Sequence, residues 1–435
     1  MNTFKHLRNV LFKQIDLLSD HASLFVNNPA ADFSRNRKFS FNSLMKMIIS
    51  MESGALKDEL FKFFGFNLDT PTASAFVQAR DKIKVDAFKT LFDSFNNKTY
   101  SKKLFNGYRL IAVDGCELPI NNSVYYDDTT LFRYGGTNKP YSAFHLNASF
   151  DLLECTYDDL IIQGQAKMDE NAALWSLVDR YKGPKAIFIA DRGYESYNGF
   201  EHIAHSGNKY LIRIKDIQSR NAISRSLVPE PDGEFDVDVS RLLTLKQTKM
   251  IKACPQLYKF LPQNVRFDYM TKENPWYEFN CRIVRFKITD DTYECIATNL
   301  DRDRFPPEII KELYHKRWGI ETSFREVKYA LGLNALHSKK RNLIQQEIYA
   351  RLLLHNFAQR IVAKVKFPEK KRKYIYQVNF TRSFHIIREF LKKKTSGDPP
   401  VDNLIAKEIL PIRPGRSDPR HVRPKSAVCF NYRYD

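Results

Sequence analysis

The sequence predicts an α/β protein built on a mixed sheet with covering helices, preceded by a helical N-terminal region. Three observations support this fold class. Residues 1–100 place apolar residues at helical spacing. From about residue 108 to 215, short apolar runs typical of strands alternate with helical segments. Of the 435 residues, 43% are hydrophobic and 13% are aromatic, which is enough for a large folded core.

The N-terminal region, residues 1–100, is expected to be helical and to bind DNA. A helix in "TPTASAFVQARDKI" has Thr70 or Thr72 as its candidate cap. This helix carries Gln78, Arg80 and Lys82 and follows another helix after a short turn. Two helices joined in this way, the second cationic, are typical of a DNA-reading module. A helical bundle without DNA contacts is the alternative.

The central region, residues 101–215, alternates between strand and helix patterns. Strands are expected in "YRLIAVDG", "AFHLNASFD" and "TYDDLIIQG", followed by a helix in "DENAALWSLVDRY". A strand in "KAIFIADRGYES", a helix in "YNGFEHIAHSG" and a strand in "KYLIRIKD" complete the series. Three strands, then helix, strand, helix and strand, indicate a mixed sheet covered by helices.

The remaining segments follow different patterns. Residues 216–300 contain the strand-like runs "FDVDVS", "YEFNCRIVRFKI" and "YECIATNL" with lysine-rich connections, which indicates a β-rich insertion. A long helix is expected from Phe305, with two prolines in its first turn. A further helix is expected in "NLIQQEIYARLLLHNFAQRIV", so that residues 301–365 return to helix. Residues 366–435 form a basic C-terminal region with the runs "EKKRK" and "LKKK".

The charge balance points to a polyanionic partner. Lysine and arginine number 69 against 50 acids, a net charge of +19, and an excess of this size usually means nucleic acid. A basic protein without such a partner is the alternative. The six cysteines include no C-x-x-C pair, which argues against a zinc site and against a disulfide framework and fits a reducing cytosol. No apolar run reaches membrane-spanning length and no signal-peptide core is present, so we expect a cytoplasmic protein without a membrane partner.

One helical stretch, "YHKRWGIETSFREVK", places four polar side chains on one narrow face. At about 100° per residue, Tyr314, Arg317, Glu321 and Lys328 lie within about 60° of one another. The neighbouring face is apolar and is expected to pack in the core; it consists of Leu313, Ile320, Phe324, Val327 and Leu331. Trp318 is also expected to pack in the core. A solvated charged face is the alternative for the four polar residues.

Two predicted strands end in an acid close to a glycine. Asp114 ends "AVDG" and Asp191 ends "IADRG". Together with Glu321, they could supply three carboxylates to one site, and such a set suits two hard divalent cations that act on a phosphodiester. Aspartates in ordinary turns are the alternative, because Asp-Gly is also a strong turn signal.

These residues resemble the signature of a known family. Tyr314, Arg317, Glu321 and Lys328 reproduce Y-(2)-R-(3)-E-(6)-K with every spacing intact, and this signature marks the insertion-sequence-4 family of DDE transposases. "AVDGCELPI" resembles the family's first aspartate segment, and "IADRGYESY" resembles its second. The resemblance runs from about Tyr108 to Lys328, and the final "RPGRSDPRHVRPK" is also similar to the family's tail.

The resemblance implies a fold like ribonuclease H, interrupted by the β-rich insertion. It implies that Asp114, Asp191 and Glu321 are catalytic and bind two Mg²⁺ ions, with Mn²⁺ as a substitute. It further implies that Tyr314, Arg317 and Lys328 bind DNA phosphates near the cleavage point. Trp276 is a candidate for contact with a flipped base, and packing within the insertion is its alternative.

The implied activity is cleavage of double-stranded DNA at the terminal inverted repeats of a mobile element and joining of the ends to target DNA. The implied assembly is a homodimer synapsed on DNA, acting at the nucleoid in a bacterial cytoplasm. Two alternatives stay open at this point. One is a ribonuclease-H-like nuclease without strand transfer, and the other is a catalytically inactive DNA-binding relic.

Overall fold

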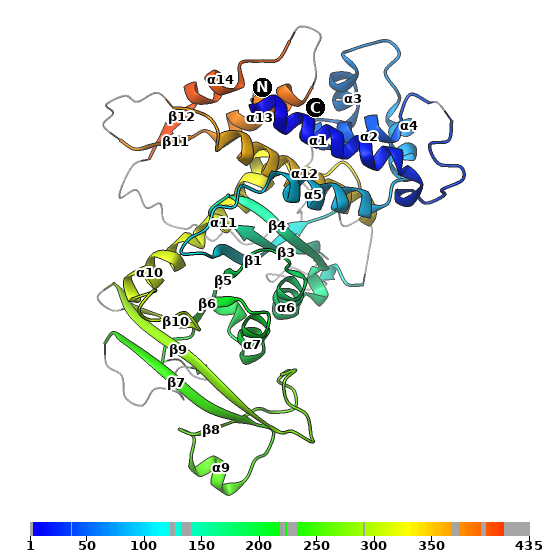
Figure 1. Cartoon of the computed structure of the whole chain (residues 1–435). Coiled ribbons are helices and arrows are strands. Elements are labelled where there is room, and N and C mark those ends of the chain that lie inside the picture. Colours follow the sequence, from blue (N-terminus) through cyan, green and yellow to red (C-terminus); the bar gives the residue numbers. More distant parts are fainter. Residues whose placement is uncertain are drawn as a thin grey trace.

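The computed structural model of the chain has a large mixed sheet in the middle, and helices from both ends of the chain pack together at one end of it (Figure 1). The structure describes residues 3–412, except 36, 122–126, 132–140, 218, 220–221, 224–232, 290–291, 368–373 and 393–396. The "RPGRSDPRHVRPK" tail and the whole of "EKKRK" therefore lie outside the described residues. Within the described residues, no helix combines the length and the apolar character that a bilayer span requires.

The N-terminal region is helical, as predicted. Its elements are α1 (Thr3–Asp20), the 3₁₀ turn η1 (Ala22–Phe25), α2 (Phe41–Ser50), α3 (Leu56–Phe64), α4 (Ala73–Arg80) and α5 (Val85–Thr99). Thr72 caps α4, since its hydroxyl accepts a hydrogen bond from the Ala75 amide at 3.1 Å. Ser40 and Ser43 form a reciprocal capping box at the start of α2.

The N-terminal helices share one hydrophobic core with the last helices of the chain and one face of the sheet. Those last helices are α12 (Arg341–Val362), α13 (Phe380–Leu391) and α14 (Val401–Lys407), and a two-stranded ribbon of β11 (Tyr376–Val378) and β12 (Ile409–Pro411) lies beside them. Aromatic pairs tie α5 to α12, with Phe92 and Tyr349 ring centroids 6.1 Å apart and Phe95 and Phe357 centroids 5.9 Å apart. Burial of these large rings is a major contribution to the stability of the contact.

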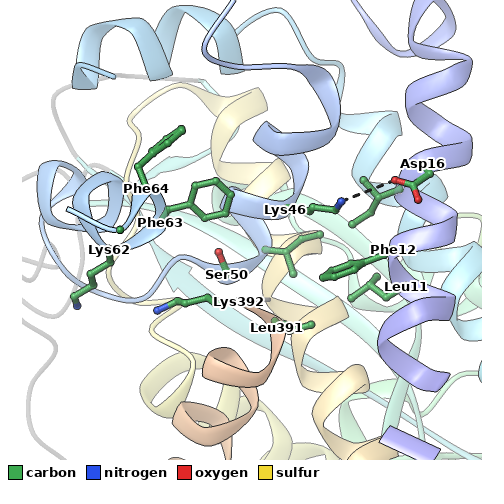
Figure 2. A pocket seen from close by; sticks show the side chains of 13 residues that line it. Leu11, Phe12, Asp16, Lys46, Ser50, Lys62, Phe63, Phe64, Leu391 and Lys392 are labelled. Atoms are coloured by element: carbon green, nitrogen blue, oxygen red, sulfur yellow. Dashed lines mark ion pairs between the residues drawn. The ribbon is translucent and has the colours of Figure 1, made fainter. Parts of the chain in front are cut away.

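A cavity of about 780 Å³ lies among these helices (Figure 2). Apolar side chains of α1, α2 and α13 line it, and lysines stand around them. Lys46 points toward Asp16, and their charged atoms are 3.9 Å apart. No residue that lines this cavity belongs to the strands or the helix that carry the three predicted acids.

The sheet has ten strands in the order β2-β3-β1-β5-β6-β10-β9-β7-β8, with β4 paired to β3. The strands are β1 (Arg109–Pro119), β2 (Thr130–Leu131), β3 (Tyr141–Asp151), β4 (Thr156–Gly164), β5 (Ala186–Ala190), β6 (Lys209–Ile214), β7 (Phe235–Thr244), β8 (Tyr258–Phe260), β9 (Trp276–Thr289) and β10 (Thr292–Thr298). Strands β1, β5 and β6 are parallel to one another, whereas β3 runs antiparallel to β1 and to β4. The predicted mixed α/β sheet is confirmed.

The β-rich segment does not leave the sheet. Strand β10 pairs antiparallel with β6, and β9 and β7 continue from it, so these strands extend the same sheet away from β5. The short helix α9 (Lys249–Ala253) and β8 lie at the outer end of this extension.

Helices cover both faces of the central strands. On one face, α6 (Glu170–Arg180) and α7 (Tyr197–His205) pack against alternate strand residues that include Ile111 and Val113. On the other face, α10 (Pro307–Lys316), α11 (Trp318–Arg325) and α12 cover the residues between them, Leu110 and Ala112. Because side chains alternate along a strand, this pattern decides the face on which Asp114 lies.

Candidate active site

The three predicted acids come from three elements that meet at one edge of the sheet. Asp114 continues the even-numbered series of β1, so its side chain lies on the α11 face. Asp191 directly follows β5, which is parallel to β1, and its Oδ1 accepts a hydrogen bond from the Gly193 amide at 2.8 Å. Glu321 lies in the middle of α11. Period-two alternation and parallel strand ends therefore direct all three acids to the same edge.

Arg317 links two of these acids directly. Its Nη2 lies 2.8 Å from Glu321 Oε1, and its Nη1 lies 3.6 Å from Asp114 Oδ2. The side chain of Arg317 is 7% exposed, and its Nε has no hydrogen-bond partner among the described residues. The guanidinium thus occupies a position where two carboxylates face a single cation.

The carboxylates also act on one another electrostatically. The pKa of Asp114 is raised to about 7; burial is the largest cause, and the negative charges of Asp191 and Glu321 also raise it. The Gly115 amide, which donates to Asp114 Oδ1, and the Arg317 guanidinium act in the opposite direction. A rise is expected where like charges gather, although burial is the larger cause here.

The helix that carries the signature is interrupted, whereas one long helix was expected. It divides at Arg317 into α10 and α11, and a π-helical turn, η4 (Glu326–Ala330), follows. In η4 the Leu331 amide bonds the Glu326 carbonyl, five residues earlier. Packing near the division is close, since a Cβ at Gly319 would lie 3.0 Å from Leu152 Cδ2. The apolar face that the sequence predicts on this helix is buried, from Leu313 to Leu331.

The other signature residues have different surroundings. Lys328 Nζ donates to the Glu117 carbonyl of β1 at 2.7 Å, which connects η4 to the strand that carries Asp114. Tyr314 is 4% exposed and packs in the core between α10 and the sheet. Its hydroxyl has no hydrogen-bond partner among the described residues, and burial raises its pKa. Its ring centroid lies 5.7 Å from the Arg317 guanidinium.

Trp276 and Trp318 have different surroundings. Trp276 begins β9 and contacts Tyr258 and Lys246. Since β9 runs in the same direction as β5, Trp276 lies at the edge of the sheet opposite to Asp191, and its contact with a flipped base stays a prediction. Trp318, expected in the core, is 55% exposed, because its position lies outside the apolar stripe of α11; its ring lies 5.4 Å from Arg317.

One residue assigned to a DNA-reading surface points inward. Arg80 on α4 is 1% exposed and contacts Glu347 of α12 at 2.9 Å. Lys82 contacts Asp32 at 3.4 Å, whereas Gln78 is exposed. The cationic character of α4 toward solvent is therefore smaller than the sequence suggests.

Two residues near the acids escaped the sequence reasoning. Glu170 begins α6, and its Oε1 lies 2.9 Å from Nε2 of His145 on β3. They lie close to Gly115, which follows Asp114, and Glu170 also lies close to Gly193, which is two residues after Asp191. Only the position of Glu170 in the first turn of a predicted helix after "MD" was visible in the sequence, and that position is ordinary for an acid.

The three acids have the chemistry that a hard cation requires, although their side chains are not arranged around a common cation position. Among the described residues, no three His, Cys, Asp or Glu side chains stand in a ready metal-binding group. Three carboxylates supply the oxygen ligands that divalent cations such as Mg²⁺ prefer. The cation that Asp114 and Glu321 face here is the Arg317 guanidinium, which shows that this space accepts positive charge.

The chain is similar to known transposases. The model of a family described as the transposase DDE domain matches residues 105–357, which include all three acids. Over 373 residues the chain is 21% identical to transposase InsG for insertion sequence element IS4 of Escherichia coli (strain K12), a match that covers 81% of this chain and 76% of that protein. A cryo-EM structure of the piggyBac transposase synaptic complex with hairpin DNA aligns with a TM-score of 0.46 and 10% identity, over 94% of this chain and 87% of that chain.

The resemblance to the insertion-sequence-4 family is thereby confirmed. The family match covers more than half of the chain and includes both strand-end aspartates and the signature helix. Members of this family carry out metal-dependent DNA cleavage and strand transfer. This chain belongs to the transposase DDE-domain family and is a DNA transposase.

Proposed function

We propose that Asp114, Asp191 and Glu321 are the catalytic acids of this transposase, and that they cut DNA at the terminal inverted repeats of an insertion sequence. The same site would then join the freed ends to target DNA by transesterification. The observation that supports the proposal is that the elements that carry the three acids meet at one sheet edge. There, Arg317 contacts two of them, and Asp191 and Glu321 raise the pKa of Asp114.

The proposed cofactor is a pair of Mg²⁺ ions, with Mn²⁺ as a substitute. Asp114, Asp191 and Glu321 would hold the ions through carboxylate oxygens. When bound, the ions supply activation of the attacking water or hydroxyl and stabilisation of the leaving oxygen. Asp114 must be deprotonated to act as a ligand, and positive charge in the site favours this form.

We assign Arg317 and Lys328 to the DNA phosphates. Among the described residues, Arg317 Nε has no partner, and the guanidinium contacts the acids through Nη1 and Nη2, so it can exchange these contacts for a phosphate. Lys328 is anchored to β1 through the Glu117 carbonyl, which places a second cation beside the strand of Asp114. Tyr314 was expected to hold a phosphate; since its hydroxyl is buried, we propose that its ring positions Arg317 instead.

We propose that β1, β3, β4, β5 and β6 form a ribonuclease-H-like core. Three antiparallel strands, then α6, β5, α7 and β6, support this assignment. In this division, residues 1–100 are the helical DNA-binding part, 101–215 and 301–365 are the two parts of the core, 216–300 are the insertion and 366–435 are the basic C-terminal region. The shared cores imply that these parts fold together rather than as separate units.

The proposed partners are element-end and target double-stranded DNA, consistent with the net charge of +19. We further propose a homodimer synapsed on the DNA, acting at the nucleoid in a bacterial cytoplasm. Two copies would allow both element ends to be processed together.

Strand-transfer assays test the proposal. Duplexes that carry the inverted repeats flanking the coding region are incubated with the chain and with Mg²⁺ or Mn²⁺, and cleavage and joining are followed separately. Both products are expected from the wild type, and neither is expected from Asp114→Asn, Asp191→Asn or Glu321→Gln. Cleavage without joining would indicate a nuclease, and binding with neither product would indicate an inactive relic.

A further inference from the structure

Glu170 approaches the proposed catalytic acids from the opposite side of the sheet. It is the first residue of α6, the helix that packs on the face away from α11. Asp169 caps this helix by accepting a hydrogen bond from the Ala172 amide at 2.9 Å, which fixes the backbone that carries Glu170. The side chain of Glu170 is 33% exposed, so its carboxylate lies at the rim of the sheet edge and not in the core.

Gly115 makes room for this carboxylate, and Gly193 lies beside it. A Cβ at Gly115, the residue after Asp114, would lie 2.7 Å from Glu170 Oε1 and would also overlap the His145 imidazole. A Cβ at Gly193 would lie 3.5 Å from Glu170 Oε2 and 3.1 Å from Asp191 Oδ1. Oxygens of Glu170 and Asp191 therefore lie near the same point in space. At neither glycine does the backbone require a positive φ, so the space explains the residue type.

His145 fixes the orientation of the Glu170 carboxylate. The imidazole is 5% exposed, with Nε2 at 2.9 Å from Glu170 Oε1 and Nδ1 at 3.1 Å from Gln165 Oε1. The Nε2 contact is an ion-pair distance, but its angle does not meet hydrogen-bond geometry. With Oε1 beside His145, the second oxygen, Oε2, lies toward Gly193 and Asp191.

The buried Tyr194 side chain is affected by the charges of several of these acids. Tyr194 is 1% exposed, and its hydroxyl has no hydrogen-bond partner among the described residues. Burial raises its pKa, and the negative charges of Glu170, Asp114 and Asp191 contribute in that order, while Arg317 opposes them. A buried hydroxyl without a partner among the described residues is unusual, because buried polar groups are normally satisfied.

We propose that Glu170 is a fourth carboxylate of the divalent-cation site, on the side of Asp191, and that His145 is its positioning residue. The proposal rests on the function proposed above and adds a residue that lies outside the family signature as read from the sequence. Carboxylates that hold a cation are themselves held by neighbouring groups, and loss of such groups typically lowers metal affinity about 10–100-fold.

Mn²⁺ binding to the full chain tests this role without relying on activity. The amount of free Mn²⁺ is followed by electron paramagnetic resonance during titration of wild type, Glu170→Gln, Glu170→Asp and His145→Gln. We expect His145→Gln, which removes the group that holds the ligand, to weaken Mn²⁺ binding about 10–100-fold, Glu170→Gln to weaken it at least as much, and Glu170→Asp to restore part of the affinity lost in Glu170→Gln. Affinity for end DNA, measured at fixed salt, is expected to change less than about twofold, because the phosphate contacts that dominate it are retained.

Asp179→Asn is the matched control. Asp179 lies on the same helix, its side chain is 55% exposed, and its Oδ1 lies 3.0 Å from a histidine nitrogen of His202, away from the catalytic edge. This variant should bind Mn²⁺ as the wild type does. Thermal melting identifies misfolded variants. If Glu170→Gln melts at a lower temperature than the wild type, Glu170→Asp is the variant that tests the role of Glu170. Folded Glu170→Asp is expected to bind Mn²⁺ more weakly than the wild type does.

The outcomes separate this inference from the proposed function. Wild-type Mn²⁺ affinity in folded Glu170→Gln, together with a loss in Asp114→Asn, would overturn the role of Glu170 and leave the three acids in place. Unchanged Mn²⁺ binding in both variants, or no binding by the wild type, would overturn the proposed three-acid site and the role of Glu170 with it.

Discussion

Two buried arginines, Arg80 and Arg317, contact acids whose pKa values are shifted in opposite directions: that of Glu347 is lowered and that of Asp114 is raised. Arg80 contacts Glu347 at 2.9 Å between α4 and α12, and Arg317 contacts Asp114 and Glu321 at the catalytic edge. Burial opposes ionisation of both Glu347 and Asp114. Even so, the pKa of Glu347 lies well below its usual range, whereas that of Asp114 is raised to about 7.

The difference lies in how completely each carboxylate is paired. Glu347 receives a charged nitrogen of Arg80 and, on both of its oxygens, the His337 amide at 3.0 Å. Arg80 also commits Nε to Gln346 and Nη2 to the Leu343 carbonyl. At the proposed catalytic edge, one arginine contacts two acids, and its Nε has no partner in the part of the chain that the structure describes. Full pairing indicates a structural role, and incomplete pairing indicates a site that still has capacity for a cation or a phosphate.

Asp114→Asn should give the largest effect on activity and the smallest loss of stability. Removal of a proposed metal ligand should reduce cleavage below detection, while the fold loses a carboxylate that burial already disfavours. Gel assays of cleavage and joining, with thermal melting of the same samples, measure both effects. Affinity for end DNA should be retained, with the wild-type salt dependence. Substantial residual cleavage by this variant would place the chemistry elsewhere.

Glu347→Gln should show the opposite pattern. Breaking a buried, fully paired ion pair typically costs about 3–5 kcal/mol, because the Arg80 charge stays buried without its partner. Urea unfolding of the full chain measures the change in the free energy of unfolding. Glu312→Gln is the control, since its pair with Lys316 is exposed and should contribute no more than about 1 kcal/mol. A loss in Glu347→Gln as small as in the control would contradict the structural role.

The sequence was sufficient for the residues whose roles depend on local pattern. Apolar strands that end in Asp114 and Asp191, and the spacing from Tyr314 to Lys328, were readable without a structure. Contacts between residues that are far apart in the sequence could not be predicted in this way. The burial of Tyr314, the inward turn of Arg80 and the exposure of Trp318 depend on which helix packs against which face. Glu170 was missed because its neighbours, Gly115 and Gly193, come from distant segments.

Arg317→Ala should lower DNA processing about 10–100-fold without weakening metal binding. Loss of a charge-assisted phosphate contact corresponds to about 1.5–3 kcal/mol. Since the guanidinium contacts Asp114 and Glu321, its removal should leave Mn²⁺ affinity equal to or above that of the wild type. Single-turnover cleavage and a separate Mn²⁺ titration distinguish the two effects. Lys316→Ala, an exposed neighbour paired with Glu312, is the control. Normal cleavage by Arg317→Ala would make this arginine only a charge partner of the acids.

Asp114 and Glu347 should affect the pH dependence of stability in opposite directions. The pKa of Asp114 is raised in the folded chain from 3.8 to about 7, so its ionisation destabilises the fold as pH rises through this window. The pKa of Glu347 is lowered from 4.5, so its contribution to stability is present above that value and is lost as pH falls.

Melting curves without divalent metal measure these contributions. Relative to Asp114→Asn, the wild type should lose stability between about pH 4 and 7, by an amount on the order of a few kcal/mol. Relative to Glu347→Gln, the wild type should gain stability as pH rises toward about 4.5, mostly below that range, and the difference should then stay constant. A constant difference between wild type and Asp114→Asn across pH would contradict the raised pKa of Asp114.

The most direct measurement of a shared cation site is anomalous diffraction from crystals of the full chain with end DNA and Mn²⁺. We predict manganese peaks about 2.0–2.6 Å from carboxylate oxygens of Asp114, Asp191 and Glu321, with the Arg317 guanidinium moved from the acids to a DNA phosphate. Manganese bound away from these three acids, with Arg317 still between Asp114 and Glu321, would contradict the account.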